Sequence, residues 1–207
     1  MSPDDRRHAP AADRNKAPLL EVLARVFPAS GLALEIAAGT GQHAVFFARH
    51  LAGRGGDGVL RWQPTDRDED ALASIAAWRD AEPHPALLPP LPLDVTADDW
   101  PVDRADAILC VNMIHISPWE ATVGLMRGCK RLLAPGAPLV TYGPYAVDGE
   151  HTAPSNAAFD ASLKSRDPRW GVRDVADVAA CAREHGLLLE ERVPMPANNF
   201  SLVFRRV

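Results

Sequence analysis

The residues from Glu35 to His43 join an apolar strand pattern to a helical pattern through a turn of small side chains. Within this turn, Gly39 and Gly41 flank Thr40. Glycine lets the backbone adopt positive φ and lets a ligand approach it closely. The start of the following helix presents unpaired backbone N–H groups. These residue types at this spacing predict a binding site for a nucleoside-type cofactor.

Two classes of nucleoside cofactor use such a turn, and the position of an acidic residue separates them. The segment from Gly39 to Ala44 fits the dinucleotide string G-x-G-x-x-G/A, which alone is weakly specific. Glu35 lies inside the first strand, four residues ahead of Gly39, and is not part of that fingerprint. A carboxylate there suits S-adenosylmethionine (SAM), which carries a cationic sulfonium and no pyrophosphate. The alternative is a structural acid that holds backbone amides of its own turn.

The second strand pattern, residues 59–65, ends in another acid, Asp66. Nucleotide-binding α/β folds hold the ribose hydroxyls with an acid at the end of this strand. Asp66 lies 25 positions beyond Gly41, close to the interval of about 20 residues in such folds. The alternative is that Asp66 or Asp68 caps the following helix.

Further candidate cofactor residues lie outside these two strands. Asp94 and Val95 end a short third strand, where they could bond the adenine amine and pack on its face. Capping of a helix by Asp94 or Thr96 is the alternative. Arg14 and Asn15 precede the first helix pattern and are candidates for closing over the cofactor carboxylate, because Arg pairs with carboxylates in bidentate geometry.

The apolar run at 105–111 predicts a strand buried on both faces. It delivers Asn112 and Met113 to its carboxyl end, where ligands bind in open α/β sheets. His115 follows and is a candidate acceptor-orienting group or general base, because its unperturbed pKa of about 6.5 lets it take a proton at neutral pH. Ser117 is interpreted as a helix N-cap rather than as a nucleophile.

A long polar loop follows the fifth strand pattern, residues 137–142, and is a candidate substrate lid. Within it, Tyr145 and His151 could bind or deprotonate an acceptor. Alternatively, Tyr145 packs the loop and His151 faces solvent. In the helix predicted next, Asp160 precedes Lys164 by four residues, which favours a surface ion pair.

The elements that position these residues alternate between strand and helix, which predicts an α/β fold with a doubly wound, mostly parallel sheet. A helix is expected over 17–27, and residues 1–13 are expected to form a mobile arm. The 207 residues, 47% hydrophobic and 24% charged, suit a single domain over 14–207.

The composition also limits the classes of binding partner and the cellular location that we expect for this protein. The net charge of -5 and the scattered basic residues argue against a nucleic-acid partner. No apolar stretch of about 18 residues occurs, and the N-terminus lacks a secretory signal, so no membrane span and a cytoplasmic location are expected. The three cysteines, Cys110, Cys129 and Cys181, have no C-x-x-C spacing, so no metal site is expected and we interpret them as core residues in a reducing compartment.

The pattern around Glu35 resembles the acidic-h-G-x-G-x-G signature of class I SAM-dependent methyltransferases, with Ala37 in the place of the first glycine. The wider chain, from about residue 10 to 205, resembles the methyltransferase-like 26 family, formerly a domain of unknown function. The segments that carry this resemblance are 14–16, 35–47, 62–66, 112–120, 142–145, 151–156, 159–163, 166–171 and 195–199. The resemblance implies a Rossmann-like methyltransferase fold with an antiparallel last strand, and a largely unassigned substrate.

The resulting hypothesis is a SAM-dependent methyltransferase that acts on a nitrogen or oxygen atom of a small-molecule acceptor. In this hypothesis, the main contribution of the protein is to position the two reactants in a site that excludes water. His115, Tyr145 or His151 would assist an acceptor that has an acidic proton. The rival hypotheses are an NAD-dependent oxidoreductase and a non-catalytic SAM-binding interaction protein. The oligomeric state is left open. The expected cofactor-binding residues are Arg14, Asn15, Glu35, Ala37, Gly39, Thr40, Gly41, His43, Asp66, Asp94, Val95, Asn112 and Met113.

Overall fold

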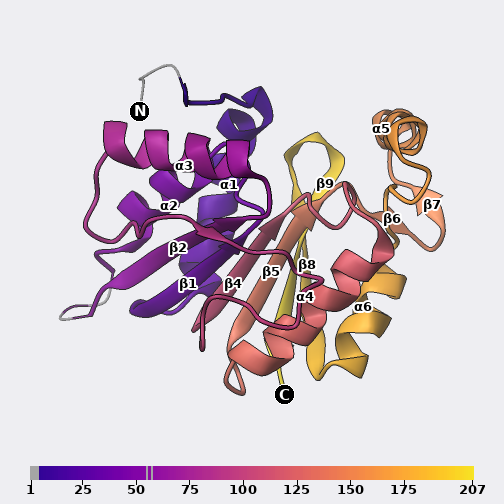
Figure 1. Cartoon of the computed structure of the whole chain (residues 1–207). Coiled ribbons are helices and arrows are strands. Elements are labelled where there is room, and N and C mark those ends of the chain that lie inside the picture. Colours follow the sequence, from indigo (N-terminus) through magenta and orange to yellow (C-terminus); the bar gives the residue numbers. More distant parts are fainter. Residues whose placement is uncertain (1–4, 55, 57) are drawn as a thin grey trace.

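A seven-stranded sheet with the strand order β3-β2-β1-β4-β5-β9-β8 forms the centre of the protein (Figure 1). The computed structural model describes residues 5–54, 56 and 58–207, so residues 1–4 of the expected arm lie outside the described part. The strands are β1 (Gly31–Ile36), β2 (Leu60–Asp66), β3 (Leu91–Pro92), β4 (Ala107–Val111), β5 (Pro138–Gly143), β8 (Leu187–Met195) and β9 (Asn199–Arg206), and a separate hairpin pairs β6 (Ala146–Val147) with β7 (Glu150–His151). The helices are α1 (Pro10–Val26), α2 (Gln42–Leu51), α3 (Glu69–Ala81), α4 (Trp119–Leu132), α5 (Pro154–Arg166) and α6 (Val175–Glu184).

The strands from β3 to β5 run parallel to their neighbours, whereas β9 pairs antiparallel with both β5 and β8. The expectation of a mostly parallel, Rossmann-like sheet with an antiparallel last strand is therefore confirmed. Strand β1 lies between β2 and β4. The turn after β1 consequently opens at the middle of the carboxyl edge of the sheet.

Alternating side chains of β1 enter two apolar layers. Leu34 and Ile36 pack in the layer that includes α4 and α6, whereas Ala33 packs in the layer that includes α1 and α2. This alternation follows from the period of two along a strand. It directs Glu35 to the same side as Ala33, within the protein interior.

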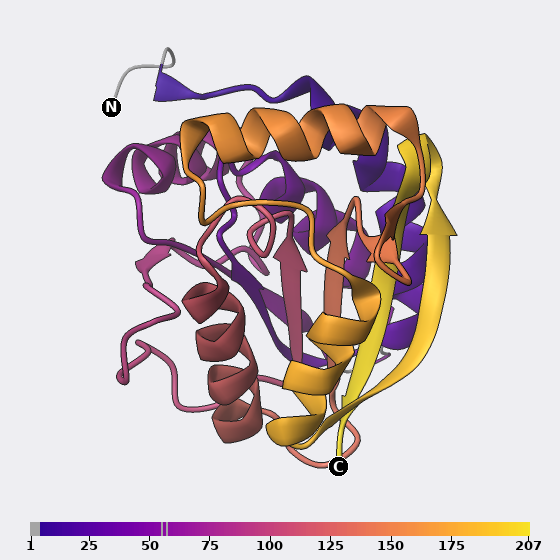
Figure 2. The same ribbon diagram turned by 90° about the vertical axis from the view of Figure 1, so that its right-hand side faces the viewer.

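Helix α5 takes no part in these two layers and lies across the carboxyl ends of the parallel strands (Figure 2). Its Asn156 side chain donates to the Asn198 carbonyl oxygen, 2.9 Å away, in the connection between β8 and β9. The segment between β5 and α5, which was expected to be a lid, thus leads into a helix above the carboxyl edge of the sheet.

Two local expectations, the start of the first helix and the extent of the third strand, differ from the structure. Helix α1 begins at Pro10 rather than near Ala17, so residues 10–13 of the expected arm form its first turn, where the missing N–H of proline is tolerated. Strand β3 covers only Leu91–Pro92 and ends before Asp94. No helix in the described part of the chain is long and apolar enough to cross a membrane.

Candidate functional site

The backbone between β1 and α2 turns through three residues in the left-handed region. The φ angles of Ala37, Gly39 and Gly41 are 54°, 59° and 90°. A Cβ atom at Gly41 would lie 2.8 Å from the Ile75 Cα atom, which requires glycine there, whereas the nearest atom to a Cβ atom at Gly39 would be the Ala37 carbonyl oxygen, 4.0 Å away. The turn therefore packs tightly against α3 on one side and leaves its backbone accessible at Gly39.

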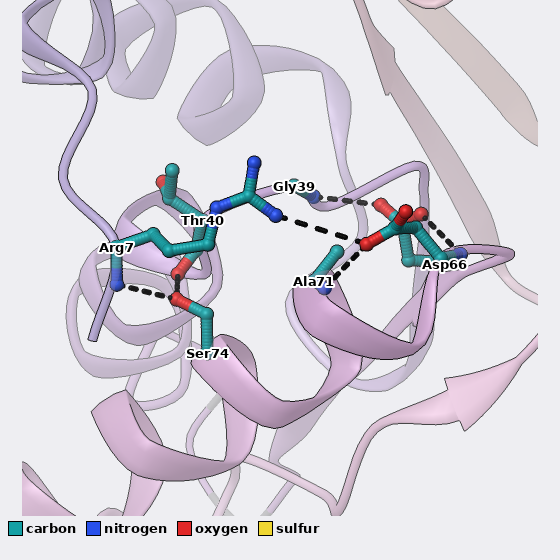
Figure 3. Close-up of polar contacts among 7 residues, drawn as sticks. Arg7, Gly39, Thr40, Asp66, Ala71 and Ser74 are labelled. Atoms are coloured by element: carbon teal, nitrogen blue, oxygen red, sulfur yellow. Dashed lines mark hydrogen bonds and ion pairs between the residues drawn. The ribbon is translucent and has the colours of Figure 1, made fainter. Parts of the chain in front are cut away.

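Asp66, at the end of β2, is hydrogen-bonded to this turn. Its carboxylate accepts from the Gly39 N–H at 2.9 Å (Figure 3) and from the Asp68 N–H at 3.0 Å. Asp68 is the residue that caps α3, since its side chain accepts from the Ala71 N–H at 2.8 Å. Each carboxylate oxygen has a second lone pair, so Asp66 retains the capacity to accept from two hydroxyl groups.

Glu35 is buried, with 1% of its surface exposed, and accepts a hydrogen bond from the Trp62 indole N–H at 2.6 Å. Burial raises the pKa of Glu35 to about 8, although the bond from Trp62 opposes this shift. The side chain consequently contacts an indole of the neighbouring strand, not the backbone amides of its own turn.

Residues from α1, α2 and β5 meet on the α1 side of this edge. The Nε2 atom of His43 lies 2.7 Å from Asn15 Oδ1. Burial lowers the pKa of His43 to about 4, so the ring is neutral and donates through Nε2. Burial also raises the pKa of the Tyr142 phenol, opposed by hydrogen bonds with Asn15 and Asn199 and by the charge of Arg14. Arg14 and Asn15 are thus brought beside Tyr142.

Tyr142 and Asn199 are absent from the site expected from sequence. Tyr142 is the penultimate residue of β5, directly before Gly143, and this position near the carboxyl end of a strand was the available sequence signal. Asn199 is the first residue of β9, so only the antiparallel return of that strand beside β5 brings it to Tyr142.

The residues after β3 and β4 form loops beside the turn. The Thr96 hydroxyl and N–H both donate to Asp94, which lowers the pKa of Asp94, and Arg67 lies 3.8 Å away. Asp94 therefore caps a turn rather than a helix. Asn112 is left-handed at φ 63°, and its N–H donates to the Tyr142 carbonyl oxygen at 2.8 Å.

The remaining two loop residues are packed inward. Val95 is buried, and its carbonyl lies so close to Gly124 of α4 that a Cβ atom there would collide with it. The Ser117 hydroxyl donates to the Met113 carbonyl oxygen at 2.6 Å. Pro118, not Ser117, occupies the N-cap of α4, so the expected capping role of Ser117 is wrong.

His115 and Tyr145, two of the three candidate catalytic residues, are fully buried and pack edge to face at 4.6 Å. The Tyr145 hydroxyl donates to Thr141 Oγ1 at 2.7 Å. Burial and the charge of Arg173 lower the pKa of His115 to about 3. Its Nδ1 accepts from the Arg173 N–H at 3.2 Å, and its Nε2 has no partner in the described part of the chain. Both side chains are closed off from solvent.

His151, the third candidate, lies on β7 with a third of its side chain exposed. Its Nε2 is 3.5 Å from Asp160 Oδ2. The predicted pair of Asp160 with Lys164 is present at 2.6 Å, although the Asp160 side chain is nearly buried. Burial alone would raise the pKa of Asp160, but hydrogen bonds from Lys164 and from the Val172 N–H hold it below its usual value. Asp160 is thus an ionised carboxylate beside an accessible imidazole.

One protein-family model matches nearly the whole length of this chain. A protein-family model described as "Protein of unknown function (DUF938)" matches residues 6–206. The match extends from the segment before α1 to the end of β9, and so includes the turn, Asp66 and the hairpin that carries His151.

Solved structures of methyltransferases have a similar fold. CalO1, described as a methyltransferase in calicheamicin biosynthesis in its SAH-bound form, is 19% identical with a TM-score of 0.71, over 93% of this chain and 54% of that chain. MmcR, the mitomycin 7-O-methyltransferase, is 19% identical with a TM-score of 0.76, over 93% and 54%. An O-methyltransferase family 2 protein from Planctomyces limnophilus DSM 3776, in complex with apigenin, is 18% identical with a TM-score of 0.72, over 93% and 61%. The chain therefore has the methyltransferase fold and spans about half the length of CalO1 and MmcR.

Proposed function

This chain belongs to the DUF938 family, and we propose that it is a SAM-dependent methyltransferase that acts on a nitrogen or oxygen atom of a small-molecule acceptor. We further assign it to the methyltransferase-like 26 family, on the sequence segments described above. The observation that carries the proposal is the link between the two halves of the cofactor site. The Gly39 N–H and the Asp66 carboxylate are joined at 2.9 Å across the carboxyl ends of β1 and β2.

The solved structures of similar fold support this choice of chemistry. The CalO1 structure contains SAH, the demethylated form of the cofactor, and MmcR methylates an oxygen atom of mitomycin. The net charge of -5 also favours a small acceptor over a nucleic acid. We propose that residues 14–207 form the methyltransferase domain.

The residues at the carboxyl edge fit the parts of SAM. The open space at Gly39 accepts the close approach of a ligand, and Asp66 has free lone pairs for the ribose hydroxyls. Asp94 and Val95 would hold the adenine, and Arg14 and Asn15 the carboxylate of the aminoacyl part. The proposal also retains Glu35, Ala37, Thr40, Gly41, His43, Asn112 and Met113 as residues that shape this site. When bound, SAM supplies a methyl group that is already activated for transfer.

The three candidate catalytic residues differ in their exposure to solvent. His115 and Tyr145 are enclosed, so we propose that they support the floor of the acceptor site by packing. His151 is accessible and paired with Asp160, so it is the candidate that can take a proton from an acceptor with an acidic N–H or O–H. Because SAM carries its own activation, the main task of the protein is to position the two reactants and to exclude water.

Calorimetric titration of the protein with SAM, SAH and NAD tests the cofactor assignment. We expect binding of SAM and SAH and no binding of NAD. Tight binding of NAD without SAM would instead identify a dinucleotide enzyme. Transfer of a labelled methyl group to a panel of small nitrogen and oxygen nucleophiles then tests catalysis. SAM binding without transfer to any acceptor, together with a stable protein partner, would indicate an interaction protein.

A further inference from the structure

The residues before α1 are docked on α3 rather than extended away from the protein. We call residues 5–9 the N-terminal strap. The Arg7 N–H donates to Ser74 Oγ at 2.8 Å, and the Arg7 carbonyl oxygen accepts from the Trp78 indole N–H at 2.9 Å. Both partners lie on α3, one turn apart. The backbone of Arg7 is therefore held on both its donor and its acceptor side.

The same contacts continue into the cofactor turn. The Ser74 hydroxyl is buried and donates to the Thr40 carbonyl oxygen at 2.8 Å. The Ala9 N–H donates to Gln42 Oε1 at 2.6 Å, and this oxygen also accepts from the Thr40 hydroxyl at 3.0 Å. The backbone and the side chain of Thr40 are thus both fixed by groups that bond to the strap.

A second route runs from the Arg7 side chain to Gly39. The Arg7 guanidinium group lies 3.7 Å from Asp68 Oδ1. The Asp68 N–H donates to Asp66, and Asp66 accepts from the Gly39 N–H. The strap consequently reaches the turn on both sides, through Ser74 to Thr40 and through Asp68 and Asp66 to Gly39.

The small contribution of an exposed ion pair to folding indicates that this contact acts on ligand binding instead. The ion pair between Arg7 and Asp68 is more than half exposed, and such a pair contributes little to folding. The pair nevertheless holds Asp68, the N-cap of α3, and the Asp68 N–H donates to Asp66 at the end of β2. A group that stabilises a binding conformation rather than the fold raises ligand affinity, and the ligand stabilises that group in return.

We propose that the N-terminal strap closes the cofactor site and that Arg7 is a positioning residue, which holds the Gly39 to Gly41 turn in its binding conformation through Ser74 and Asp68. Strap docking and binding of the cofactor nucleoside then strengthen each other. This inference rests on the proposed function, because it takes the adenosine part of SAM as the ligand of the turn.

Calorimetric titration of the full chain with SAH tests the two routes separately. Arg7→Ala removes the guanidinium group but keeps the backbone bonds of the strap, whereas Ser74→Ala breaks the link to Thr40. Each variant should bind SAH about fivefold or more weakly than the wild type. Arg25→Ala is the matched control, because Arg25 forms an exposed ion pair with Glu191 on the surface of α1, and its affinity should be unchanged.

Amide hydrogen exchange gives the readout that a merely structural role would not produce. The amides of Arg7 and Ala9 are bonded to Ser74 and Gln42, so their exchange should slow when SAH binds the wild type. Unchanged affinity in both variants, with no SAH-dependent protection of these two amides, would overturn the strap proposal and leave the methyltransferase proposal intact. Absence of SAH binding by the wild type would overturn both.

Discussion

The Asp66 carboxylate accepts a hydrogen bond from the Gly39 backbone N–H at 2.9 Å, although the two residues are 27 positions apart in the sequence. Parallel pairing of β1 with β2 brings the two strand ends together. The bond fixes the turn and the acid relative to each other before a ligand arrives. Such preorganisation lowers the cost of binding.

Asp66→Asn should weaken SAH binding by about 10-fold or more, since a bond to a charged acceptor contributes about 1.5–3 kcal/mol. The amide nitrogen of Asn would also face one of the two backbone N–H donors. Calorimetric titration with SAH measures the effect. Asp98→Asn serves as the control, because the Asp98 side chain is 94% exposed and pairs with Arg127 of α4. Equal affinity of both variants would remove Asp66 from the cofactor site.

Gly41→Ala should destabilise the fold more than Gly136→Ala. Both glycines have positive φ, 90° and 83°, so both substitutions carry the cost of about 1–2 kcal/mol for a left-handed alanine. Only at Gly41 does the new Cβ atom meet another backbone, at 2.8 Å from Ile75 Cα, whereas the space at Gly136 is open. Urea unfolding of the two variants measures the difference. A larger loss at Gly136 would contradict the close packing of the turn on α3.

Glu35 should make the free energy of unfolding fall as the pH rises. The pKa of Glu35 is raised in the folded state from 4.5 to about 8, so the folded state binds the proton more tightly. The stabilising contribution is complete below pH 4.5, declines as the pH rises, and is lost above about pH 8. The decline can reach about 1.4 kcal/mol per pH unit.

Glu35→Gln isolates this effect, since glutamine can still accept from Trp62 but does not titrate. Urea unfolding of both proteins between about pH 5 and 9 should give a difference in stability that changes with pH up to about pH 8 and then levels off. The buried His43 and His115 have lowered pKa values and act in the opposite direction below pH 6.5, and subtraction of the two curves removes their contribution. Parallel curves would show that Glu35 is ionised in the folded protein.

His151→Ala should lower kcat for an acceptor with an acidic proton by about 10²-fold, the lower end of the range for general base catalysis. The affinity for SAH should stay the same, because His151 lies on β7 and belongs to the acceptor side of the proposed site. Asp160→Asn should lower kcat by a smaller factor through loss of the orienting charge. His50→Ala, an exposed histidine of α2, is the control. Full activity of His151→Ala would exclude this residue as the base.

The sequence by itself determined the fold class and the location of the glycine turn after β1, which we propose holds the cofactor. The apolar run at 105–111 and the small residues from Ala37 to Gly41 are local sequence patterns. The period of a strand or helix is set by residues close together along the chain. The rule that ligands bind at the carboxyl ends of parallel strands then placed Asp66 and Asn112 on one edge. These inferences need no knowledge of packing.

Only the tertiary structure decided the environment of each side chain. Nothing in the sequence distinguishes His115 and Tyr145 from an exposed pair, but they pack against each other and the 171–173 segment bonds to His115, and both are fully buried. Arg7 belonged to an expected arm, yet it bonds to α3 through residues 67 and 71 positions away. Burial, pKa and long-range hydrogen bonds depend on which segments meet in space, and that information is distributed over the whole chain rather than carried by any one motif.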